Sequence, residues 1–195
     1  MDLTRRQQLE AKREQLQTML RYKEFQEVYV EPFFDILDHF DTLKIAHRII
    51  SFRCVPLEFH QLLQEFKETL DLDKYKVSDV LISADDIQVQ NILTVFPSVN
   101  PFRYVLNAPI IGYESNPKEI LQELKNIHKL DDKKVFICYL RYAFLLEISF
   151  TDLAKKANNE IFISWHGDTI IFPSDHSWII DYTLEDEWLF SFKAE

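Results

Sequence analysis

The sequence predicts an α+β fold, with an N-terminal helical part followed by a mainly antiparallel sheet. Three observations predict it. The first half of the chain carries apolar residues at helical spacing, and residues 161–193 alternate in the period of two that strands show. The third observation is size: 195 residues with 47% hydrophobic content are enough to bury one core. We therefore expect residues 1–195 to form a single domain.

The first predicted helix spans residues 1–29, which contain no Gly or Pro and carry a sparse apolar stripe. The predicted helix is polar in its first part and more apolar toward its end. We therefore expect the start of this helix to project into solvent or against a partner helix, which leaves a homodimer through the helix open. Its basic residues are nearly balanced by acids, and this favours a solvated face over a nucleic-acid arm.

Four further helices are predicted before residue 130 from apolar spacing and capping signals: 32–40, 56–70, 83–96 and 117–127. Ser83 and Asp86 resemble a cap for the third of these. Asn116 supplies the N-cap of the fourth, with Pro117 in its first turn. Residues 43–55 fit a helix or a strand equally well.

A strand is expected at 102–106, within an irregular stretch rich in Pro and Asn. Val135–Leu140 is apolar at every position, as a strand covered on both faces would be. Residues 141–150 contain no turn signal, so the strand boundaries there stay open. Thr151 is expected to cap a short helix, which residues 158–159 would end in the left-handed conformation.

Residues of approximately 161–193 predict a four-stranded C-terminal meander. Its strands are Ile161–Trp165, Thr169–Pro173, Trp178–Thr183 and Trp188–Lys193. We expect one face of the meander to lie in the core and the other to be wetter. The three tryptophans are expected to anchor the core.

Composition excludes several classes of function. The chain carries a net charge of −10, and residues 159–195 hold eight acids against one base, which repels nucleic acid and favours a basic partner. With only two glycines, Gly112 and Gly167, it lacks the common phosphate-binding loops, and we expect no cofactor. Cys54 and Cys138 fit buried thiols in a reducing compartment. No segment fits a signal peptide or a membrane span, which favours the cytoplasm.

Few residues are arranged for chemistry. Asp175, His176 and Ser177 include the three residue types of a catalytic triad, but consecutive residues in a turn cannot meet as a triad requires. We assign no catalytic residue and no metal ligand from the sequence alone.

One edge of the predicted meander gathers polar turn residues. In an up-and-down sheet the first and third turns share an edge, so His166 and Asp168 should lie about 10 Å from Glu185, Asp186 and Glu187. A histidine among carboxylates could act as a general base or hold a hard cation. Turns are also polar simply because they are wet.

Two functions follow from these residues. The first is a non-catalytic acidic protein that captures a basic protein partner, of the immunity-protein or inhibitor type, by analogy of size and charge. The second is a small metal-dependent or general-base enzyme with its site at the edge of the meander. The motif poverty of the chain favours the first.

Overall fold

The computed structural model describes residues 3–25, 27–28, 31–52, 81–82, 87–100, 104–113, 116–130, 134–141, 144–163 and 167–194. Within them lies an eight-stranded sheet in the order β2-β1-β5-β4-β6-β7-β8-β3. The strands are β1 (His47–Phe52), β2 (Leu81–Ile82), β3 (Ile110–Tyr113), β4 (Lys134–Tyr139), β5 (Phe144–Ser149), β6 (Thr169–Pro173), β7 (Trp178–Tyr182) and β8 (Glu187–Phe192). Neighbouring strands are antiparallel except β1 and β2. The predicted α+β class is confirmed.

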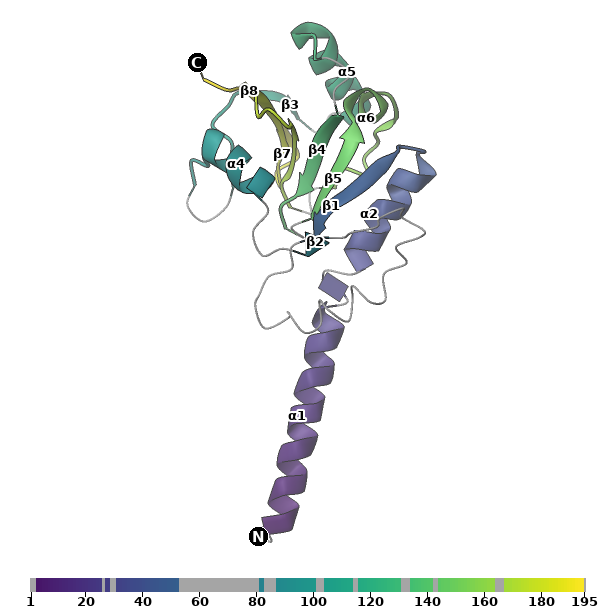
Figure 1. Ribbon diagram of the computed structural model, residues 1–195, viewed down its shortest axis with the longest axis vertical. Coiled ribbons are helices and arrows are strands. Elements are labelled where there is room, and N and C mark those ends of the chain that lie inside the picture. The colour runs from purple at the N-terminus through teal and green to yellow at the C-terminus, as the bar shows by residue number, and fades with distance from the viewer. Residues whose placement is uncertain are drawn as a thin grey trace.

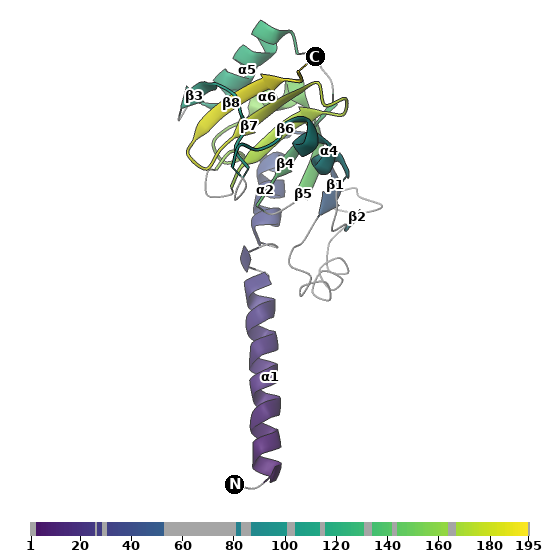
Figure 2. The ribbon, with the colours of Figure 1, turned by 90° about the vertical axis from the view of Figure 1, so that its left-hand side faces the viewer.

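The described helices are α1 (Leu3–Phe25), α2 (Glu31–Thr42), α4 (Ile87–Val95), α5 (Pro117–His128) and α6 (Phe150–Lys156). Helix α1 extends away from the rest of the molecule (Figure 1). Helices α2, α5 and α6 cover one face of the sheet, and α4 lies on the other (Figure 2). None of the described helices combines the length and the apolar character that a membrane crossing needs.

The sheet is buried on both faces. On the face of α2, α5 and α6, Phe33, Leu121 and Leu153 pack with one set of strand residues. On the opposite face, Ile92 and Phe96 pack with the alternate set. All residues of β6 and β7 are buried, so the expectation of a wetter second face was wrong. The second face of the sheet is buried because α4 and the chain that follows it pack on it. The alternation of residues within the strands does not reveal this contact.

Several predicted helices are confirmed within the described residues. Helix α2 contains the predicted 32–40, α4 lies within the predicted 83–96, and α5 starts as predicted at Pro117 and ends one residue later, at His128. The Asn116 side chain accepts a hydrogen bond from the Lys118 backbone N–H at 3.1 Å, as expected of an N-cap. The predicted helix 56–70 and the proposed cap at Ser83 and Asp86 lie outside the described residues.

Residues 43–55, which the sequence left between helix and strand, contain β1. This strand pairs with β5, and Glu147 of β5 accepts hydrogen bonds from Arg48 of β1 and Lys134 of β4. The two bases keep the pKa of Glu147 below its ordinary value, against the opposing effect of its burial. Cross-strand partners thus support the strand at this position.

The first strand of the predicted meander, Ile161–Trp165, is a correction. Residues 161–163 form a turn, in which the Ile161 N–H donates to the Asn158 carbonyl, and residues 164–165 lie outside the described part. The place beside β6 is taken by β4, which supplies a longer apolar strand from further back in the chain. The other three strands follow one another as the meander β6-β7-β8.

The strand expected at 102–106 is also corrected. Its described part forms only an isolated bridge between Leu106 and Ser98, and the regular strand lies further on, at β3. Strand β3 (Ile110–Tyr113) pairs with the edge of β8 that faces away from β7.

The cap of α6 is Ser149, not Thr151. The Ser149 hydroxyl accepts from the Asp152 N–H at 3.2 Å, and the Thr151 hydroxyl contacts the Lys125 ammonium instead. The predicted left-handed ending at residues 158–159 was wrong, because the chain leaves α6 at Ala157 in an extended conformation. Strand β5 therefore runs into α6 with no intervening turn.

Candidate functional site

The predicted site residues fall at one end of the sheet, where β6 begins and β7 passes into β8. Asp168 directly precedes β6 and is buried, whereas Glu185 is exposed and Asp186 and Glu187 are half-buried. His166 lies outside the described residues. The structure thus brings together four of the five carboxylate and imidazole groups that the sequence singled out.

The turn between β7 and β8 is held by a dense set of hydrogen bonds to Thr183. Its hydroxyl accepts from the backbone N–H groups of Glu185 (3.2 Å) and Glu187 (3.3 Å). Its carbonyl accepts from the Asp186 N–H at 3.2 Å, and its N–H donates to the Glu187 carbonyl at 3.0 Å. The Tyr182 hydroxyl donates to the Asp186 carboxylate at 2.5 Å. These bonds fix the directions in which the turn presents its carboxylates.

Asp168 ties the start of β6 to this turn. Its carboxylate accepts from the Leu184 N–H at 3.1 Å, and its backbone carbonyl accepts from the Leu140 N–H at 3.0 Å. The contact joins Asp168 to the residue that directly precedes the three acids of the turn, because β6 and β7 are direct neighbours. Asp168 is a buried support of the turn rather than a wet turn residue.

A second carboxyl group, that of Asp181, lies on the face of the sheet that α4 covers. Asp181 of β7 is completely buried, and within the described part of the chain no donor meets the usual hydrogen-bond geometry at either of its oxygens. Burial, and then the charge of Asp168, raise the pKa of Asp181 well above its ordinary range, although the nearby Leu106 N–H acts in the opposite direction. These surroundings therefore favour the protonated, neutral form of Asp181.

Half-buried Tyr104 adjoins the two acids from the loop that follows α4. Its hydroxyl donates to the Phe96 carbonyl at 3.4 Å. Burial raises the pKa of Tyr104, and the charges of Asp181 and Asp168 raise it further. A neutral acid beside a carboxylate is an arrangement that can store or transfer a proton. Because Asp181 is fully covered, a substrate could reach it only if the residues packed over this face moved.

Asp181 and Tyr104 were missed by the sequence analysis. Strand alternation placed Asp181 on a face that was expected to be wet. A signal was present, because Asp181 is the single charged residue in a strand whose other members are all apolar or aromatic. A single charged residue in such a strand can lie on an exposed face or be buried. Which of the two applies depends on whether another part of the chain covers that face, and the strand sequence does not show this.

A row of polar side chains crosses the opposite face at this same end of the sheet. Tyr139, Thr169, Tyr182 and Trp188 are consecutive register partners across β4, β6, β7 and β8. The Thr169 hydroxyl and the Trp188 indole nitrogen are buried with no hydrogen-bond partner within the described residues. Trp188 and Trp178 are core residues, as predicted, and Trp165 lies outside the described part.

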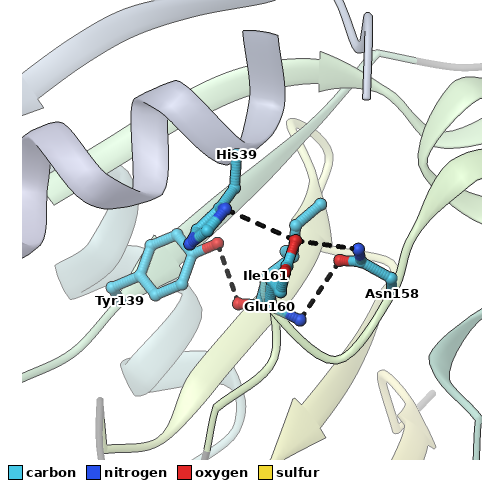
Figure 3. Close-up of polar contacts among 5 residues, drawn as sticks. All are labelled: His39, Tyr139, Asn158, Glu160 and Ile161. Carbon is cyan, nitrogen blue, oxygen red and sulfur yellow. Dashed lines mark hydrogen bonds and ion pairs between the residues drawn. The ribbon is translucent and has the colours of Figure 1, made fainter. Parts of the chain in front are cut away.

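Figure 3 shows a polar cluster that joins α2 to the turn before residue 162. The His39 ring lies 3.5 Å from the Glu160 carboxylate, which also accepts from the Asn158 amide at 3.1 Å. The Tyr139 hydroxyl donates to the Ile161 carbonyl at 3.2 Å, and burial raises the pKa of Tyr139. Each group here is engaged in holding the turn, so we interpret the cluster as structural.

The remaining candidates are also structural. Asp175 accepts from both the N–H and the hydroxyl of Ser177, so these residues form the turn that was predicted for them. The His176 ring stacks on the ring of Phe172. Cys138 is a buried cysteine, as predicted, and Cys54 lies outside the described part.

No group of three His, Cys, Asp or Glu side chains suited to a metal ion occurs among the residues that the structure describes. Comparison of the chain with protein-family models, with curated proteins and with solved structures found no match.

Proposed function

We propose that the protein is a non-catalytic binding protein that captures a basic surface of another protein. The surface is the acidic edge, which we define as the turn 184–187 together with the adjoining strand β3. The observation that carries the proposal is the fixed turn, in which Thr183 and Tyr182 hold three consecutive acidic residues in one conformation. A preformed turn loses little conformational entropy when a partner binds.

The acidic edge combines charge with apolar area, as protein-binding surfaces do. Leu184 is 41% exposed at the tip of the turn, beside the carboxylates. Tyr113 of β3 is the register partner of Glu187 and is 58% exposed. The chain around the turn is also strongly acidic, which would steer a basic partner toward this edge.

The partner class is that of the targets of immunity proteins and inhibitors, which are often basic enzymes. This assignment rests on size and charge together with the fixed acidic turn. A cytoplasmic location is part of the same proposal, and the two cysteines, which lie in apolar segments of the sequence, support a reducing compartment.

Affinity capture tests the proposal. The bait would be the parent protein, the edge variant Glu185→Gln/Glu187→Gln, and a control variant Asp35→Asn/Glu123→Gln. The control removes the same charge from exposed positions on α2 and α5. We expect the parent and the control to recover a basic protein from the native cell extract in about 50 mM salt and to lose it in about 500 mM salt.

The edge variant should recover that protein at least about tenfold less efficiently than the control. Equal recovery by the edge variant and the control would contradict the proposal, because the charge would then act without regard to its position.

A second candidate is an enzyme at the same edge, which the buried acid pair of Asp181 and Asp168 favours. A raised pKa favours the protonated form of Asp181, and that is the form in which a carboxyl group donates a proton. For the metal-dependent version, divalent ions should raise the melting temperature of the parent but not of the variants His166→Ala and Asp168→Asn. If no divalent ion shifts the parent, that version is wrong.

A further inference from the structure

Helix α1 carries charge of the opposite sign to the rest of the chain. Its residues Leu3–Phe25 include six basic and three acidic side chains, a net charge of +3. The whole chain has a net charge of −10, which leaves −13 on the remaining residues. The helix would be about 35 Å long at 1.5 Å per residue, and it extends away from the domain (Figure 1).

The same helix exposes its large apolar side chains. Leu9, Leu16, Met19 and Leu20 are 52%, 60%, 69% and 65% exposed. Leu9 and Leu16 are seven residues apart, and Leu20 follows four residues later, so the three share one side of the helix. An apolar stripe on a helix normally faces a partner.

Basic residues border this stripe. Arg5 and Lys12 lie four residues before Leu9 and Leu16, on the same side of the helix, and Arg13 lies on the other border. Glu10 and Glu14 lie on the far side, where Glu10 accepts a hydrogen bond from Arg6 at 3.1 Å. The exposed stripe of α1 is therefore both apolar and basic.

The acidic edge has the complementary composition. It carries the turn carboxylates of residues 185–187 beside the exposed Leu184. On β3, Ile110, Ile111 and Tyr113 are 51%, 38% and 58% exposed. Apolar side chains next to acids match apolar side chains next to bases, and both surfaces are present in every copy of the chain.

We propose that α1 of one copy docks on the acidic edge of a second copy of this chain. The helix cannot contact the edge of its own domain in this structure, because it points away from the domain in both views (Figures 1 and 2). A second copy supplies the edge at equal concentration. The interaction rests on the proposed function, since it gives the acidic edge a basic helix as ligand and would compete with any other basic partner.

Pairing of two α1 helices is a weaker match. In a parallel pair each residue faces its own copy, so Lys12 would meet Lys12 and Arg5 would meet Arg5. In an antiparallel pair the basic first half would meet a second half with no net charge, since Arg21 and Lys23 balance Glu14 and Glu24 there. The acidic edge offers the stronger charge complementarity.

Sedimentation equilibrium of the purified full chain tests the proposal. We expect reversible self-association of the parent at about 50 mM salt that weakens at about 500 mM salt. Lys12→Glu should weaken it about tenfold, whereas Arg21→Glu, an equal charge reversal away from the stripe, should leave it within about twofold. Both positions are exposed on α1, so neither change disturbs the core of the domain.

A mixing experiment identifies the surface that α1 contacts. The edge variant Glu185→Gln/Glu187→Gln should also be impaired about tenfold in self-association. An equimolar mixture of this variant with Lys12→Glu should associate more tightly than either alone, because an intact helix then meets an intact edge. Circular dichroism of each variant confirms that α1 is still helical.

Three results would overturn the proposal. A parent that remains monomeric at all concentrations in low salt excludes it and leaves the capture experiment on the acidic edge unaffected. Association that the edge variant retains in full points to pairing of α1 helices. Binding of α1 to anionic lipid vesicles, equal for the parent and the edge variant and without self-association, points to a membrane as the occupant.

Discussion

Asp181 is a carboxylic acid buried among apolar side chains, whereas a carboxylate is most stable in water. It lies between Ile170 of β6 and Leu189 of β8, its register partners, and is completely buried. A carboxylate placed there would lose its hydration without gaining an ion pair, so the neutral form is retained. The residue thus links the stability of the sheet to pH.

The substitution Asp181→Asn tests this link. Since the pKa of Asp181 is raised in the folded state, the folded protein holds a proton that the unfolded chain releases above a pH of about 4. The stabilising contribution is fully present below that pH and is lost as the pH rises toward the folded pKa. An asparagine is neutral in both states, so the free energy of unfolding of the variant should not show this decline.

At pH 8 we expect the free energy of unfolding of the variant to exceed that of the parent, because only the parent must keep a proton that its unfolded chain has released, a cost of up to about 1.4 kcal/mol per pH unit. Urea unfolding across pH 4 to pH 8 would measure it, with the exposed Asp41→Asn as a control. Parallel pH profiles for the parent and Asp181→Asn would show that Asp181 is not neutral.

The proximity of Asp168 to the third turn could be predicted at the residue level, because turns on alternate connections of a meander share an edge. The burial of Asp168 and Asp181 could not. It depends on α4 and on Tyr104, which reach the sheet from a distant part of the chain. Long-range cover of this kind leaves no periodic pattern in the strand that it covers.

At the level of elements, the junction of β5 and α6 shows how one residue can serve two structures. Ser149 is the last residue of β5 and the N-cap of α6, and its hydroxyl accepts from the Asp152 N–H. Phe150 and Leu153 of this short helix are completely buried. The cap therefore orients a helix whose side chains belong to the core.

Ser149→Ala should lower the free energy of unfolding by about 1 kcal/mol, the usual loss for an N-cap. Thr151→Ala is the matched control, since it removes a hydroxyl two residues further along that caps nothing and contacts Lys125. Its effect should be about 0.5 kcal/mol or less. Chemical denaturation would measure both, and a larger loss for Thr151→Ala would place the cap where the sequence first suggested it.

Elements with local signals were predicted well, and those that depend on distant partners were not. Helix α5 carries its own cap at Asn116 and a regular apolar stripe, so its start was identified from a few residues. Strands β1 and β3 become strands because β5 and β8 offer them an unpaired edge. The turn at 161–163 was read as a strand because β4 had not been recognised as the neighbour of β6.

At the scale of the whole molecule, the net charge of −10 at pH 7 affects the stability of the folded state. Mutual repulsion of the acids opposes the compact state, and salt screens that repulsion. Raising sodium chloride from about 20 mM to about 200 mM at pH 8 should therefore increase the melting temperature by about 2–4 °C, equivalent to about 1 kcal/mol for a chain of this size.

The same salt step near pH 5.1, the isoelectric point calculated from the sequence, should have a much smaller effect. Thermal unfolding followed by circular dichroism at both pH values provides the comparison. A shift of equal size at the two pH values would mean that salt acts through solvation of apolar surface rather than through screening.

The order of the strands also constrains how the chain can fold as it is synthesised. Five adjacent strands of the sheet, β5-β4-β6-β7-β8, come from residues 134–192, while α2 and β1 precede them. Until that later segment has left the ribosome, the apolar side of α2, with Phe33, Leu37 and Phe40, has no sheet to cover. The nascent chain would thus expose this surface until residues 134–192 have emerged, and a ribosome stalled before residue 134 would present it to chaperones.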